Sequence, residues 1–198
     1  MSNYSLYVCD VETTGLDPIK HDVIELSLLR LQDGCQKTWQ IKPTNTSTID
    51  SGALRVNGHK LEDLLHQTKF GKDNYKEASK VLVEVENWLL EDNVSSEFRL
   101  LVGQNINFDK TMLEQLWTKC ECRDTFPFGR RTMDTMMIEF FLDWCKNSLS
   151  EGYSLNNLTK KYGVKNEKAH TAEADVKATK EVFEKQVDYF KKVLASQK

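Results

Sequence analysis

The chain has 198 residues, of which 39% are hydrophobic and 29% charged, with 9 Gly and 3 Pro. This composition excludes collagenous and low-complexity proteins and is sufficient for one well-cored domain, which we expect to span residues 1–198. The net charge of -3 gives no overall basic field. Any binding of nucleic acid must therefore depend on a local patch or on bound cations.

The cysteines and the apolar runs indicate the cellular setting. The 5 cysteines are scattered and odd in number, and the sequence shows neither a leader peptide nor a run of membrane-spanning length. This pattern favours reduced thiols in a cytoplasmic protein with no membrane association. Cys120 and Cys122 are too closely spaced for a zinc half-site of the Cys-x-x-Cys type.

Strand patterns come first along the chain. We expect three strands before any helix, at Leu6–Val11, Val23–Leu31 and Lys37–Ile41. Asp33-Gly34 is a turn signal that joins the last two strands as a hairpin. The polar segment Pro43–Asp50 is predicted to be a loop.

Helical patterns and single strands alternate through the rest of the chain. Two further strands are expected, at Leu100–Val102 and Thr132–Met133, with Asp134 as the N-cap of the following helix. The predicted helices are Ser51–Val56, Leu61–Gln67, Tyr75–Leu90, Phe108–Cys120, Met136–Trp144, Leu155–Tyr162 (ended by Gly163) and Thr171–Leu194. This order predicts an α/β fold with a mixed five-stranded sheet flanked by helices.

The first strand carries two acids, Asp10 and Glu12, on the face that it shares with Leu6 and Val8. Two like charges at the end of an apolar strand repel and are costly to desolvate unless cations hold them. The alternative is a frayed strand end with both acids in water.

Two more acids lie where helical periodicity expects apolar side chains. Asp109 shares a stripe with Met112, Leu113 and Leu116, and Asp175 has the register of the apolar positions of the last helix. Each has a simpler explanation, Asp109 as an acid at a helix N-terminus and Asp175 as a satisfied core acid. Together with the pair on the first strand, they are explained at once by a site for Mg²⁺ or Mn²⁺.

His170 precedes Asp175 by five residues, just ahead of the last helix. This spacing lets its imidazole reach the mouth of the predicted metal site. It is either a general base, which its pKa near neutrality suits, or a solvated histidine in a loop.

Three motifs in order resemble those of the DnaQ-like (DEDDh) 3′-to-5′ exonucleases. They are "DVETTG" at 10–15, "NINFD" at 105–109, and His170 followed five residues later by Asp175. "ALRVNGH" at 53–59, "MDTMM" at 133–137 and "YSLNNLTKKYGV" at 153–164 resemble the connecting segments of that family. The resemblance covers nearly the whole chain and implies an RNase H-like fold.

The resemblance also implies a mechanism with two divalent ions, Mg²⁺ or Mn²⁺, that releases nucleoside 5′-monophosphates. Asp10 would bridge both ions, Glu12 and Asp175 would complete one shell, Asp109 would support the other ion, and His170 would deprotonate the attacking water. Residues matching the family's substrate contacts would be Thr13, Thr14, Leu16, Asn105 and Phe108. Among these, the Thr13 backbone would receive the terminal 3′-hydroxyl and Leu16 would pack beside the terminal base.

Some positions depart from the family pattern. Many relatives carry His where this chain has Asn57 and Gln104, and here His59 follows the Gly instead. Four basic residues are candidate phosphate contacts or ordinary solvated charges: Arg130, Arg131, Lys165 and Lys168.

The expected partner is the 3′ end of single-stranded or frayed nucleic acid. Whether the strand is DNA or RNA stays open, because contacts to a 2′-hydroxyl are not visible in a motif. An RNA-trimming enzyme or oligoribonuclease is the alternative on the same fold, and a non-catalytic end-binding module or an RNase H-type endonuclease is a weaker one. We expect a stand-alone enzyme rather than a polymerase-tethered subunit, with dimerisation left open.

Overall fold

The structure, a computed structural model, describes residues 4–65, 75–120, 126–166 and 169–196. Its centre is a mixed six-stranded sheet in the order β4-β3-β2-β1-β5-β6, with β1 antiparallel to β2 and parallel to β5. The strands are β1 (Ser5–Thr13), β2 (Val23–Arg30), β3 (Gln36–Ile41), β4 (Tyr75–Lys76), β5 (Arg99–Gly103) and β6 (Thr132–Asp134). The predicted α/β class and the five predicted strands are confirmed, and β4 is an additional strand.

The prediction of a helix from Tyr75 to Leu90 was wrong at its start. Tyr75 and Lys76 pair in parallel with Gln40 and Ile41 of β3, and the helix begins only at Ala78. Helical periodicity cannot detect this pairing, because two residues are too few to show a strand pattern and their partners lie far back in the chain.

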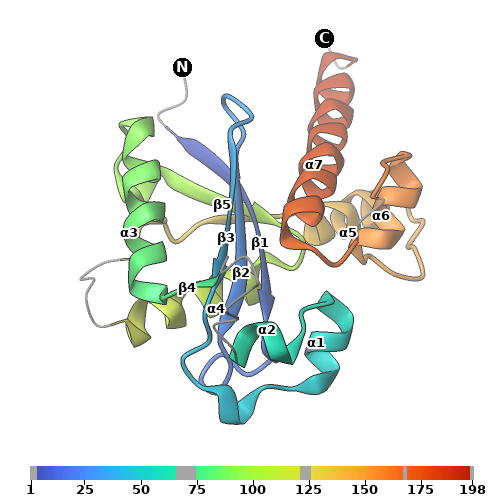
Figure 1. Cartoon of the computed structure of the whole chain (residues 1–198). Coiled ribbons are helices and arrows are strands. Elements are labelled where there is room, and N and C mark those ends of the chain that lie inside the picture. The colour runs from blue at the N-terminus through green and yellow to red at the C-terminus, as the bar shows by residue number, and fades with distance from the viewer. Residues whose placement is uncertain (1–3, 66–74, 121–125, 167–168, 197–198) are drawn as a thin grey trace.

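Helices cover both faces of the sheet (Figure 1). α3 and α4 contribute to the hydrophobic cluster on one face, whereas α7 packs on β1 and β2 from the other, with α5 and α6 beside it. The helices are α1 (Ser51–Asn57), α2 (Leu61–Leu65), α3 (Ala78–Leu89), α4 (Ile106–Lys119), α5 (Thr135–Cys145), α6 (Leu155–Tyr162) and α7 (Ala172–Ala195). Short 3-10 helices lie at Thr46–Thr48, within the predicted loop, and at Leu90–Asp92 and Ser96–Phe98.

The expected helix limits are largely confirmed. Asp134 caps α5 by accepting a hydrogen bond from the Met136 backbone N–H, and Gly163 ends α6 in the left-handed conformation. The end that was predicted for the second short helix, Gln67, lies outside the described residues.

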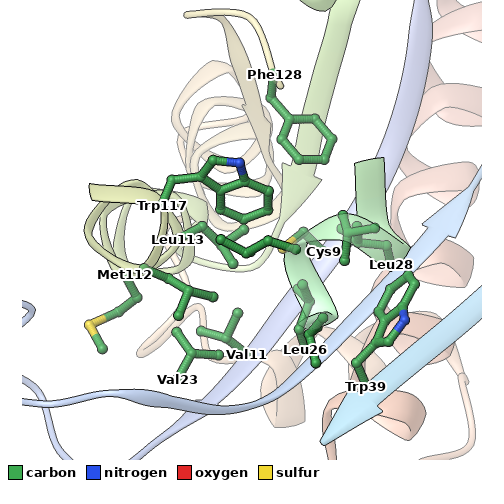
Figure 2. Close-up of a cluster of buried hydrophobic side chains, with 14 of the residues drawn as sticks. Cys9, Val11, Val23, Leu26, Leu28, Trp39, Met112, Leu113, Trp117 and Phe128 are labelled. Atoms are coloured by element: carbon green, nitrogen blue, oxygen red, sulfur yellow. The ribbon is translucent and has the colours of Figure 1, made fainter. Parts of the chain in front are cut away.

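The alternation of side chains along β1 divides the core into two. Cys9 and Val11 belong to the large cluster between the sheet and α4, which Figure 2 shows around Leu113 and Trp117. Val8 points to the opposite face, where it packs with residues of α7. The acids at positions 10 and 12 continue the Val8 face, as the sequence predicted, and therefore approach α7.

Candidate active site

The site lies where β1 extends beyond its neighbour. β5 pairs with β1 only from Ser5 to Val8, while β2 pairs with β1 as far as Thr13. The residues after Val8 are therefore bonded on one side and open on the other, next to the N-terminus of α4. The overhang accommodates two acids because it lies at the edge of the core rather than within it.

The turn after β1 is built around a close approach to Gly15. A Cβ atom at this position would lie 2.5 Å from Nε2 of His21, so a larger residue would displace the ring. The ring in turn accepts a hydrogen bond from the Asp17 backbone N–H, at 3.0 Å through Nδ1. The "TTG" part of the motif thus fixes the path of the chain away from the acids.

Three carboxylates meet at this point. Asp10, Glu12 and Asp175 each offer an oxygen atom, and these atoms lie within 4.8 Å of one another. Asp175 reaches the pair from the first turn of α7, where it is buried among apolar neighbours. The inward orientation that the helical register predicted for Asp175 is confirmed.

Asp109 is also buried, as predicted, but it approaches from another direction. From the first turn of α4, its Oδ1 accepts a hydrogen bond at 2.9 Å from the backbone N–H of Val11. It therefore satisfies a donor that β5 leaves open in the overhang. Asp109 is not among the three carboxylates within 4.8 Å of one another, and its charge acts on Asp10 from beside them.

Burial and neighbouring charges raise the pKa of three carboxyl groups at the site, those of Asp10, Glu12 and Asp109. Burial, followed by the charge of Asp175, raises the pKa of Glu12 to about 8. Burial also raises the pKa of Asp109 to about 8, against the lowering effect of the Val11 hydrogen bond. The pKa of Asp10 lies well above its ordinary value because of burial and the charges of Asp109 and Glu12. Such a site attracts cations.

A further buried acid, Glu25, lies directly across from Glu12 in the antiparallel pair, so both side chains share one face. Its Oε2 lies 3.4 Å from Nε2 of His59, whose Nδ1 forms a hydrogen bond with the Tyr75 hydroxyl. Sequence reasoning missed Glu25, although an acid inside the otherwise apolar "VIELSLL" gave the same signal that revealed Asp109.

Two asparagines support the site. Nδ2 of Asn57 donates to the Thr13 carbonyl at 3.1 Å, and its side chain also lowers the pKa of Glu12. Nδ2 of Asn166 donates to Oδ1 of Asp175 at 2.6 Å. Asn57 stood out in the sequence as a departure from the family, whereas nothing in the sequence distinguished Asn166.

His170 lies at the mouth of the cluster, exposed and in the left-handed region with φ 70°. Its backbone N–H donates to Oδ2 of Asp175 at 3.1 Å. The structure thus places the predicted base next to the cluster and ties its backbone to one of the predicted ligands, while its side chain stays open to solvent.

The residues predicted as substrate contacts follow the two acids of β1 or lie at the start of α4. Leu16 is 78% exposed, and Asn105 is exposed at the start of α4. Phe108 is half-buried and packs against the core. Thr13 and Thr14 are buried, and the Thr14 hydroxyl accepts a hydrogen bond from the Asp22 backbone N–H, so that this side chain holds the turn.

Three of the four basic residues considered as phosphate contacts lie within the described part of the chain. Arg131 donates to the Tyr4 hydroxyl at 3.1 Å, and Tyr4 directly precedes β1, whereas the cluster lies toward the other end of that strand. Arg130 and Lys165 are exposed, and Lys168 lies outside the described residues. Gln104, one of the positions that depart from the family pattern, donates a hydrogen bond through Nε2 to the Tyr153 carbonyl at 2.6 Å.

Comparison with known proteins gives a consistent result. The family model for the exonuclease (RNase T) family matches residues 7–183. A PolC-type DNA polymerase III of Thermotoga petrophila is 29% identical over 195 residues, which are 96% of this chain but 12% of the polymerase. The chain thus spans about an eighth of the length of such relatives.

Solved structures share the fold. Exonuclease I of E. coli, crystallised with single-stranded DNA and zinc, superposes with a TM-score of 0.70 at 17% identity, over 89% of this chain and 39% of its own. The cell-death related nuclease CRN-4 has a TM-score of 0.70 at 13% identity, over 93% of this chain and 64% of its own.

Within the described residues, no helix is long and apolar enough to cross a membrane. The family match over residues 7–183 and the mixed sheet with its helices together show that this chain belongs to the exonuclease (RNase T) family, with a DnaQ-like, RNase H-like fold.

Proposed function

We propose that this chain is a metal-dependent 3′-to-5′ exonuclease that acts on single-stranded or frayed 3′ ends and releases nucleoside 5′-monophosphates, with residues 1–198 forming one catalytic domain. The observation that carries the proposal is the cluster of Asp10, Glu12 and Asp175 within 4.8 Å, at the open end of the central strand. Exonuclease I, which has the same fold, was solved with single-stranded DNA.

The donor set fits hard divalent cations. Every ligand in the cluster is a carboxylate oxygen, the donor that Mg²⁺ and Mn²⁺ prefer, and burial without a cation raises the pKa of Glu12 to about 8. Asp10, Glu12 and Asp175 would hold the ions, with Asp109 completing the set. When bound, two such ions stabilise the charge that develops on the attacking and leaving oxygens.

The remaining residues act on the strand and on the proton. His170, exposed at the mouth of the cluster, would accept the proton of the attacking water. Leu16 would pack against the terminal base, and Asn105 with Phe108 would position the preceding nucleotide. Such contacts involve base faces and backbone, so the preference among sequences is expected to be weak.

The test is a time course on 5′-labelled single-stranded DNA and RNA oligomers in Mn²⁺, beside oligomers blocked by a 3′-phosphate. We expect a ladder that shortens from the 3′ end, stops at the block, and disappears in excess chelator. The faster of the two strands identifies the substrate class, so a strong preference for RNA would favour an RNA-trimming enzyme on the same fold.

The matched variants are Asp175→Asn and Asp188→Asn. Both replace an acid of α7, but Asp188 is 66% exposed and Asp175 lies in the cluster. We expect Asp175→Asn to lower the rate at least about 1,000-fold, because it removes a carboxylate that holds a cation. Asp188→Asn should leave the rate unchanged. A ladder that persists in Asp175→Asn would refute the assignment of the cluster.

A further inference from the structure

Helix α5 has its polar and apolar faces reversed. The acids Glu139 and Asp143 are 0% and 2% exposed, whereas Phe141 and Trp144 are 56% and 60% exposed. A surface helix ordinarily directs its apolar stripe to the core and its charges to solvent. The outward stripe on α5 includes positions 137, 140, 141 and 144, which is the spacing of one helix face.

Both buried acids of α5 have partners inside the protein. Lys161 of α6 bridges them, at 2.7 Å from each carboxylate, and Gln186 of α7 donates to Glu139 at 2.9 Å. Asp143 also accepts a hydrogen bond from the Ser150 hydroxyl at 2.6 Å. These contacts fix the rotation of the helix, so the aromatic side chains cannot turn inward without breaking a buried ionic network.

The outward residues of α5 form one patch together with two neighbours, Leu149 and Tyr189. We define this patch as Met137, Phe140, Phe141, Trp144, Leu149 and Tyr189. Tyr189 of α7 joins the stripe through Lys146, whose Nζ lies 4.3 Å from the centre of its ring. The exposed fractions of the six residues range from 37% for Tyr189 to 60% for Trp144. In Figure 1, α7 also projects beyond the sheet past α5.

The size of this patch is close to what a dimer requires. If each of the six whole side chains, aromatic or aliphatic, has about 200 Å² of surface, their exposed fractions amount to roughly 600 Å² of largely apolar area. That is at the upper end of the largest patches on monomeric proteins. A homodimer interface that is about 65% apolar would then bury roughly 900 Å² per partner, near the standard of about 800 Å².

We propose that this patch is a two-fold interface with a second copy of the same chain. The charged side chain that lies over the patch, Lys146, is stacked on Tyr189, and the acids of the helix are turned inward. Near the axis of a two-fold interface each residue meets its own copy, so the outward face of α5, whose only charged residues are the two buried acids, suits self-association. A strand of nucleic acid would instead require a row of cations.

A hollow in the patch fits the same geometry. It has a volume of about 380 Å³ and is lined by Trp144, Asn147 and Leu149, one turn from the outward Phe141. In a two-fold contact, a projecting side chain of one copy can enter the hollow of the other, and the contact is made twice. Docking of this kind excludes water from Trp144, which makes this residue the expected centre of the interface.

The experiment is sedimentation velocity on the full chain over a range of concentrations up to about 100 μM, without nucleic acid. The expected result is a species of twice the 22.9 kDa chain mass that becomes monomeric in Phe141→Glu and in Trp144→Glu. Circular dichroism confirms that both variants are folded. The matched control is Leu90→Glu, which introduces the same charge at a residue that is 65% exposed but lies after α3, and which should remain dimeric.

Two results would overturn the proposal. A wild-type chain that stays monomeric at the highest concentration excludes a second copy as the occupant. If that monomer binds an oligo-dT strand and loses affinity in Trp144→Glu, the patch is a stacking platform for nucleic acid instead. A dimer that persists in both glutamate variants places the interface elsewhere. None of these readouts depends on hydrolysis, so they are independent of the proposed activity.

Discussion

At the scale of single residues, the candidate site depends on how its carboxylates are held. Both oxygens of Asp175 accept hydrogen bonds, one from the Asn166 side chain and one from the His170 backbone. These bonds orient the carboxylate toward Asp10 and Glu12, and they also link it to the loop that carries the proposed base. Asn166 is therefore a positioning residue in our proposal, and it touches the site only through Asp175.

We predict that Asn166→Ala weakens the response to Mn²⁺. The loss of a group that orients a metal ligand typically costs about 10- to 100-fold in metal affinity or activity. The Mn²⁺ concentration that gives half-maximal hydrolysis should rise, and extra Mn²⁺ should recover part of the rate. Asn156→Ala, at an exposed position of α6, is the control. An unchanged Mn²⁺ titration in Asn166→Ala would show that this hydrogen bond does not position Asp175.

At the scale of elements, Asp22 joins three segments behind the turn that follows β1. Its Oδ2 accepts hydrogen bonds from the Thr44 and Asn45 backbone N–H groups, and its Oδ1 lies 2.8 Å from Nζ of Lys119 at the end of α4. Burial alone would raise the pKa of Asp22, but the hydrogen bonds from Lys119, Asn45 and Thr44 lower it. The backbone of Asp22 also pairs with Thr14.

We predict that Asp22→Ala lowers the free energy of unfolding by about 3 kcal/mol, because it removes the buried carboxylate that accepts from Thr44 and Asn45 and that faces the Lys119 ammonium. Urea denaturation measures the change. The comparison is Glu84→Ala, which breaks the pair with Lys76, two side chains that are 42% and 50% exposed, and should cost under about 1 kcal/mol. Equal effects of the two substitutions would show that Asp22 does not hold these three segments together.

At the scale of the whole molecule, the buried acids of the site make the stability of the fold depend on pH. The pKa values of Glu12 and Asp109 are about 8 in the folded protein, against ordinary values of 4.5 and 3.8. A carboxyl whose pKa is raised by folding stabilises the fold while it is protonated in both states. This contribution is complete below the ordinary pKa and is lost as the pH rises toward about 8.

We therefore predict that, in the presence of a chelator, the melting temperature falls as the pH rises from about 5 to about 8.5. Each fully titrating group contributes up to about 1.4 kcal/mol per pH unit. Saturating Mn²⁺ should raise the melting temperature most at the alkaline end, because it binds the charged carboxylates. Differential scanning calorimetry tests both statements, and Glu12→Gln should flatten the slope in chelator. A melting temperature that is constant or rises over this range would contradict the raised pKa values.

Local pattern alone determined much of this protein. The alternation along β1 placed Asp10 and Glu12 on the α7 face, and the helical register placed Asp109 and Asp175 inside, since these orientations depend on near neighbours in the chain. The capping residues Asp134 and Gly163 were predicted for the same reason. The three motifs identified the family, which the match over residues 7–183 then showed.

Contacts between distant segments required the tertiary structure. The strand β4, the pairing of Glu25 with His59, and the hold of Asn166 on Asp175 join residues whose proximity arises from sheet order and helix packing. The reversed polarity of α5 is a further case, because Glu139 and Asp143 become interior only when α6 and α7 supply Lys161 and Gln186. The sequence determined toward which face a residue points on its own strand or helix, because that depends on near neighbours, and the packing of the elements decided which residues meet.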